Sequence, residues 1–186
     1  NAWNEITDDL TRIYKAQFGQ SVPRLFDSSA IGNDHLVQVG WSYDAIGTAY
    51  IDIGKLDLAI LYLDNSLSIG QNEGVQNLIY TAKFGLGNAY SVLGNKIRAI
   101  ELYEECLLFV RQNIIERDSE SVILCALGNT YNSVGQPQKA LNYLEQSLEI
   151  ARKLDNYNLC GHALLALGSV FQDLGNNKKA IGLYEE

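Results

Sequence analysis

A short motif recurs along the chain at an almost constant interval and constrains the fold more than any other feature. Its four copies are Ile46–Tyr50, Leu86–Tyr90, Leu127–Tyr131 and Leu167–Phe171. The glycines at positions 47, 87, 128 and 168 are separated by 40, 41 and 40 residues. A period of this size is typical of a stacked repeat array, in which each unit contacts only its neighbours.

Each repeat carries further landmarks at fixed distances from the motif. A second glycine follows seven residues later, an alanine five residues after that, and a leucine or tyrosine four residues further on. These positions are Gly54, Gly94, Gly135 and Gly175; Ala59, Ala99, Ala140 and Ala180; and Leu63, Tyr103, Leu144 and Tyr184. Glycine enters the left-handed region without a Cβ penalty, so the second glycine predicts a helix end. The pattern predicts a helix, a tight turn and a second helix in every repeat.

Polar residues just after the turn are suited to begin the second helix. Asn95 and Asn176 are residue types that cap helix N-termini, and Gln136-Pro137 places proline in a first turn, where it is tolerated. In the second repeat, apolar residues recur three to four positions apart on both predicted helices, which indicates two amphipathic helices. The small residues Gly87 and Ala99 are interpreted as packing positions that let two helices approach closely.

The series of motif, glycine, alanine and tyrosine or leucine resembles the tetratricopeptide repeat, a helix–turn–helix solenoid unit. The longer period is similar to that of kinesin light chains, the Pins/LGN spindle adaptors and cyanobacterial arrays. The resemblance covers roughly residues 35–186. It implies an all-α, right-handed superhelical solenoid of antiparallel helix pairs, with about four and a half pairs in this chain.

The repeat boundaries follow from these landmarks. We expect a degenerate N-terminal helical repeat at residues 1–34. Four tetratricopeptide repeats (TPR) should follow: TPR 1 at residues 35–73, TPR 2 at 74–115, TPR 3 at 116–155, and TPR 4, truncated in its second helix, at 156–186. A separate helical lid or linker is the alternative for the first segment. The end of the chain inside a predicted helix indicates a piece of a longer protein, because natural arrays end in a polar capping element.

Composition separates the classes of partner. The net charge is −8, the pI is about 4.7, and no run of basic residues exceeds Lys178-Lys179. Nucleic-acid and anionic membrane binding both need a basic surface, so neither is expected, and neutral or basic protein partners are favoured. The chain has no signal-peptide pattern and three cysteines without a C-x-x-C pair, which favours a reducing, cytoplasmic setting.

Signals of catalysis are few. Gly85-Leu86-Gly87 begins like a dinucleotide-binding fingerprint, but Tyr90 stands where the third glycine belongs, within a predicted helix. Cys160-Gly161-His162 offers two metal ligands where zinc requires three or four. We therefore expect no catalytic residues, no metal site and no cofactor, and predict that the protein is not an enzyme.

The resemblance implies a ligand-binding groove lined by the first helix of each pair. The residue after the packing glycine, and those four before it and three after it, share one face of that helix. The candidate groove residues are Trp41, Asp44, Thr48 and Ile51; Thr81, Phe84, Asn88 and Ser91; Val122, Cys125, Asn129 and Asn132; and His162, Leu165, Ser169 and Gln172.

Asn88 and Asn129 are the sharpest candidates in this groove. In peptide-binding relatives an asparagine at this place hydrogen-bonds the backbone of an extended ligand, because one amide offers both a donor and an acceptor. The alternative is a hydrogen bond within the helix or between repeats. Trp41 and Phe84 either form apolar pockets or are buried between repeats, the latter being favoured for Phe84.

The basic residues with which chaperone-binding relatives hold a C-terminal carboxylate are absent from this face, since the matching positions hold Asp44, Phe84, Cys125 and Leu165. An acidic C-terminal motif is therefore not expected as the ligand. The predicted function is a scaffold or adaptor that binds a peptide segment of a partner in the concave groove. A regulatory or sensor segment of a larger protein, and a self-assembly module, remain alternatives. Weak self-association is expected through the uncapped C-terminal end, at Ile181 and Tyr184.

Overall fold

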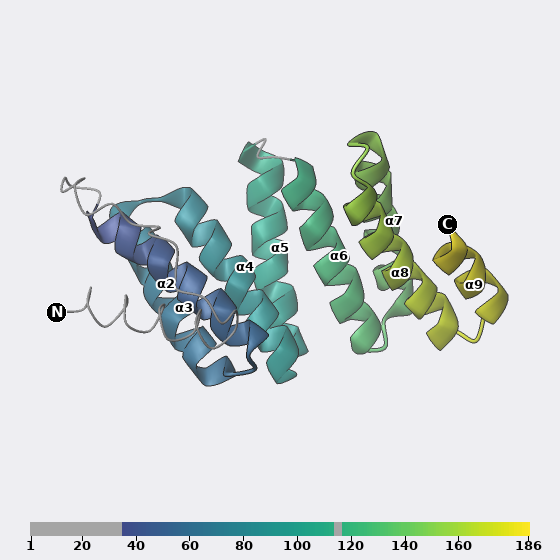
Figure 1. Ribbon diagram of the computed structural model, residues 1–186, viewed down its shortest axis with the longest axis horizontal. Helices are drawn as coiled ribbons and strands as arrows, with labels where there is room; N and C mark the ends of the chain where they lie inside the picture. The colour runs from purple at the N-terminus through teal and green to yellow at the C-terminus, as the bar shows by residue number, and fades with distance from the viewer. Residues whose placement is uncertain (1–34, 114–116) are drawn as a thin grey trace, which may run out of the picture. The chain divides into compact units, whose positions relative to one another are not determined.

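The computed structural model describes residues 35–113 and 117–186, and all the regular structure in those ranges is α-helical (Figure 1). The helices are α2 (His35–Asp52), α3 (Leu56–Glu73), α4 (Gln76–Leu93), α5 (Lys96–Asn113), α6 (Arg117–Ser133), α7 (Pro137–Lys153), α8 (Tyr157–Asp173) and α9 (Asn177–Glu185). The predicted degenerate repeat at residues 1–34 lies outside the described residues.

The chain divides into two compact units, and each is described by itself. Unit 1 runs from Asn1 to Leu93 and contains α2, α3 and α4, while unit 2 runs from Gly94 to Glu186 and contains α5 to α9. The division falls within the predicted TPR 2, between its first helix and its second.

In unit 1, α2 and α3 form a helix pair, and α4 packs against both of them. The connection between α2 and α3 spans only residues 53–55, so two long helices packed along their length must run antiparallel. Leu63 on α3 is fully buried and occupies the space that glycines leave on the neighbouring helices. A Cβ atom on Gly47 or Gly85 would come within 2.5 or 2.7 Å of this leucine, so both glycines permit a close helix approach.

Unit 2 repeats this arrangement. The pair α6 and α7 packs along its length, α8 contacts both of these helices, and α9 packs on α8. Leu144 on α7 is fully buried against Gly128 of α6, as Leu63 is against Gly47. Ser121 and Ser147 join α6 to α7 by buried hydrogen bonds in which the Oγ of each donates to the main-chain carbonyl of the other, at 3.0 and 2.8 Å.

The predicted helix ends and starts are confirmed. Gly54 and Gly135 have φ of +73°, which places them in the left-handed region that glycine enters at little cost. The Oδ1 atoms of Asn95 and Asn176 accept hydrogen bonds from the main-chain N–H groups of the residues three positions later, at 3.3 and 3.2 Å. Gln136 makes no side-chain cap, and Pro137 occupies the first turn of α7.

Candidate functional site

The candidate residues of unit 1 come from two helices that contact each other, α2 and α4. We call them the unit 1 surface, and they are Trp41, Asp44, Thr48 and Ile51 of α2 with Thr81, Phe84, Asn88 and Ser91 of α4. Thr48 is exposed, whereas the other seven side chains are partly buried. Trp41 and Phe84 are therefore neither fully buried core residues nor fully exposed surface residues.

Asp44 is the unusual member of the unit 1 surface. Its Oδ1 atom is buried and has no hydrogen-bond partner among the residues that the structure describes. Burial raises the pKa of Asp44 to about 6, and a hydrogen bond with the Thr81 side chain lowers it in part. Burial raises a carboxyl pKa because the charged form loses more hydration than the neutral form does.

The candidate residues of unit 2 likewise come from two helices in contact, α6 and α8. We call them the unit 2 surface, and they are Val122, Cys125, Asn129 and Asn132 of α6 with His162, Leu165, Ser169 and Gln172 of α8. Cys125 and Asn132 are partly buried, and the other six side chains are exposed, Leu165 at 58%. This surface is more open than that of unit 1 and holds two exposed aliphatic side chains.

Several polar groups of the unit 2 surface already have partners. Asn129 Nδ2 lies 3.7 Å from Cys125 Sγ, one turn earlier on α6. Asn132 Nδ2 donates to Asp173 Oδ2 at 2.6 Å, a contact between α6 and α8. On α8, Gln172 Oε1 accepts from the Tyr184 hydroxyl at 3.2 Å. The within-helix alternative considered for Asn129 is thus present, although the bond is long and the side chain remains exposed.

Asp173 and Tyr184 take part in these contacts but are absent from the predicted site. The sequence does contain a signal for Asp173, which follows Asn132 by one repeat period plus one residue. Asp173 therefore lies one residue beyond the position that is equivalent to Asn132 on the next first helix. Tyr184, predicted to be an unpaired apolar residue, lies with its ring against Gly168, whereas Ile181 is 55% exposed. Self-association through this end stays a prediction.

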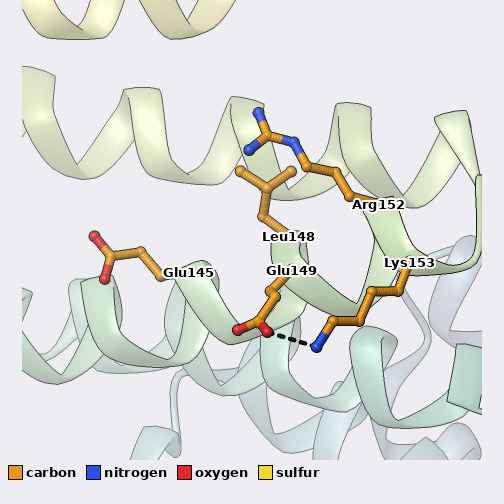
Figure 2. Close-up of a pocket in the computed structure, with 5 residues that line it drawn as sticks. All are labelled: Glu145, Leu148, Glu149, Arg152 and Lys153. Atoms are coloured by element: carbon orange, nitrogen blue, oxygen red, sulfur yellow. Dashed lines mark hydrogen bonds and ion pairs between the residues drawn. The ribbon is translucent and has the colours of Figure 1, made fainter.

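A separate open pocket of about 450 Å³ lies on one face of α7 (Figure 2). It is lined by Glu145, Leu148, Glu149, Arg152 and Lys153. Its charged groups pair within the chain: Lys153 Nζ lies 2.6 Å from Glu149 Oε1, and Arg152 pairs with Glu186. All five lining residues belong to one short stretch of α7, and both of the cations among them are already paired with carboxylates.

Within residues 35–113 and 117–186, no three histidine, cysteine or acidic side chains are grouped as a metal site requires. In the same ranges, no helix has the length and apolar character needed to span a membrane.

Comparison with known families identifies the repeat. Models of the tetratricopeptide repeat match residues 42–72, 77–153 and 119–186, and the second and third matches together cover more than half of the chain. The chain belongs to the tetratricopeptide repeat family. This match confirms the all-α fold and the family resemblance that were inferred from the spacing of glycines. A comparison with curated proteins gives no match.

Solved structures agree on the tetratricopeptide fold. A Rap protein complexed with competence and sporulation factor is 15% identical with a TM-score of 0.74, and the match covers 83% of this chain and 43% of that one. BtubC from P. vanneervenii is 20% identical with a TM-score of 0.73, over 96% of this chain and 69% of that one. A putative kinesin light chain from P. anserina is 19% identical with a TM-score of 0.66, and the match covers 97% of this chain and 81% of that one. This chain therefore spans less than half the length of the Rap chain, and at these identities the likeness is one of fold.

Proposed function

We propose that this tetratricopeptide repeat chain is a protein–protein interaction module that binds extended peptide segments on its first-helix surfaces. The observation that carries the proposal is the contrast along a single helix. Gly128 and Thr130 of α6 are buried, while Asn129 between them is exposed on the predicted ligand face. The fold thus buries the neighbours of this asparagine and leaves its side chain exposed, with a long 3.7 Å contact to Cys125 Sγ as its partner within the helix.

The chemistry of the surfaces suits main-chain recognition. An asparagine amide donates through its nitrogen and accepts through its oxygen, so it can pair with a peptide unit whatever the ligand's side chain is. Asn88 of α4 and Asn129 of α6 occupy the same position in consecutive repeats. Neither surface carries a lysine or an arginine among its members, and the net charge is −8, which favours neutral or basic segments over acidic ones.

The likeness to the Rap protein adds support, because that protein was solved in complex with competence and sporulation factor. A shared fold does not transfer a ligand by itself, so the site has to supply the chemical argument. Repeat arrays present extended surfaces built from successive units, which is the geometry that a peptide in extended conformation requires.

The test uses a displayed library of random short peptides and two double variants. The first is Asn88→Ala with Asn129→Ala, and the control is Asn65→Ala with Asn142→Ala, two exposed asparagines on the second helices α3 and α7. Circular dichroism and thermal unfolding first establish that each variant folds. We expect the wild type and the control to enrich the same peptides, and the first variant to bind them about tenfold more weakly.

Equal binding by the first variant would contradict main-chain recognition by the two amides. Failure of the folded wild type to enrich any peptide would contradict peptide binding altogether.

A further inference from the structure

Asp44 is a carboxylate without enough hydrogen-bond donors. It lies on α2 within the unit 1 surface, and its Oδ1 atom is buried without a partner in the described part of the chain. Buried polar atoms in native structures are nearly always hydrogen-bonded, so an unpaired one requires an explanation. A buried carboxylate oxygen of this kind is costly, because Oδ1 has lost its contact with water and has no donor in exchange.

The Thr81 hydroxyl, from the facing helix α4, cannot make up the shortage. Its Oγ1 atom donates to the main-chain carbonyl of Leu78 at 3.2 Å, and it also hydrogen-bonds Asp44. A hydroxyl has a single hydrogen, and an ionised carboxylate only accepts. The carbonyl of Leu78 and the carboxylate of Asp44 therefore compete for one proton, and when that proton faces Leu78 the carboxylate has no donor from Thr81.

The ionisation of Asp44 reflects this shortage. Burial raises its pKa to about 6, the hydrogen bond with Thr81 opposes the rise, and no cation of the described ranges contributes. At neutral pH the group is mostly ionised, and it is held in that form at a cost. Asp44 as a whole is only partly buried, so a positively charged donor can approach its carboxylate from the surface, where it would lower this cost and form a charge-assisted hydrogen bond.

We propose that Asp44 is the specificity subsite of the unit 1 surface and receives an arginine side chain of the bound peptide. This inference rests on the proposed function, since it names what one position of the peptide must carry. A guanidinium matches the need best, because its planar fork offers several donors to a carboxylate at once.

Trp41 supports arginine over lysine. It precedes Asp44 by three residues on α2, so the two side chains share a helix face, and the indole is only partly buried. A guanidinium stacks on an aromatic ring and pairs with a carboxylate at the same time, whereas an ammonium is a compact point charge that is more strongly hydrated. The net charge of −8 further favours approach of a cation.

The probes are four pools of acetylated, amidated hexapeptides with random uncharged residues at every position but one. That position is fixed as arginine, citrulline, lysine or glutamate. Citrulline keeps the shape of arginine and removes its charge, and the blocked ends exclude binding through a free terminal amine. The proteins are the wild type, Asp44→Asn and the control Asp57→Asn, which removes one exposed carboxylate from α3.

In the wild type we expect the arginine pool to bind about tenfold more tightly than the citrulline pool, the size of effect that one charged hydrogen bond gives. Asp44→Asn should reduce the ratio below about threefold, while Asp57→Asn should leave it unchanged. Circular dichroism and a thermal melt establish that the isosteric Asp44→Asn protein is folded.

Equal binding of the arginine and citrulline pools by the wild type would overturn the inference, and so would a tenfold ratio that survives in Asp44→Asn. If all pools bind the wild type alike and the Asn88→Ala/Asn129→Ala double variant, assayed with the same pools, binds every pool more weakly, the proposed function stands and only the subsite is wrong. If no pool binds, both fail. A lysine pool that matches the arginine pool would overturn the assignment to guanidinium.

Discussion

The unit 1 and unit 2 surfaces occupy the same repeat positions but differ in what they offer a ligand. At the third position before the packing glycine, unit 1 has Asp44 and Phe84, whereas unit 2 has Cys125 and Leu165. The unit 1 surface is mostly half-buried and holds a carboxylate oxygen without a partner. The unit 2 surface is mostly exposed, and its Asn132 is paired to Asp173. The fold fixes where these side chains lie, whereas the residue at each position decides whether the group is satisfied or available.

The largest expected effect tests what the two units share. Leu63→Ala and Leu144→Ala each remove a fully buried side chain that fills the space beside a glycine, so each should lower the free energy of unfolding by about 3 kcal/mol. Urea denaturation measures the change. The controls Leu61→Ala and Leu108→Ala truncate exposed leucines and should have little effect. A small loss in only one unit would show that its helices pack differently.

The next expected effect is a pH dependence of stability that arises in unit 1 and not at the matching position of unit 2. The folded state raises the pKa of Asp44 from 3.8 to about 6, so it binds the proton more tightly than the unfolded state does. The cost of this group is therefore absent below pH about 4 and complete above pH about 6. Asp44→Asn should stabilise the protein by about 2 kcal/mol at pH 7.5 and by little at pH 4.

Thermal unfolding at the two pH values measures this difference. The control is Cys125→Ser at the matching position of unit 2, where burial raises the thiol pKa above 9.0 and the group stays neutral in this range. Its effect on stability should be the same at both pH values. A stabilisation by Asp44→Asn that does not change with pH would contradict the account of the buried carboxylate.

A smaller effect tests whether the unit 2 surface is internally paired. The exposed hydrogen bond between Asn132 and Asp173 should contribute about 0.5 kcal/mol to stability. A double-mutant cycle of Asn132→Ala and Asp173→Ala isolates this coupling. A coupling near zero would mean that Asn132 is as available to a ligand as Asn129 is.

The smallest expected effect on stability concerns two equivalent turns, one in each unit. Gly74 after α3 and Asp155 after α7 both have positive φ, at +68° and +51°. Aspartate tolerates this conformation less well than glycine does, so Asp155→Gly should stabilise the protein by about 0.5 kcal/mol, and Gly74→Asp should destabilise it by a similar amount. Chemical denaturation of the two variants measures both changes, and an opposite order would show that neighbouring side chains dominate these turns.

The sequence predicts the fold well because the features that build it are local and repeated. The glycine of the motif and the leucine or tyrosine sixteen residues later, such as Gly47 and Leu63, pack together as the helix pair closes. Turn glycines such as Gly54 end helices through their own backbone preference. Each of these signals recurs in every repeat, so the spacing alone reveals it.

The state of the candidate site is less accessible from the sequence. Helical spacing places Asp44 on the ligand face, but the burial of its Oδ1 atom depends on how closely α4 approaches α2. The bond between Asn132 and Asp173 joins residues 41 positions apart and depends on their side-chain rotamers. Such pairings arise from tertiary packing, so a face can be predicted where its hydrogen bonds cannot.

Hydrogen–deuterium exchange with and without a peptide enriched from the random library tests the central claim most directly. The account predicts slower exchange on binding in the first helices α2, α4, α6 or α8, and unchanged exchange in the second helices α3 and α7. Protection confined to α3 or α7, with the first helices unaffected, would contradict binding on the first-helix surfaces.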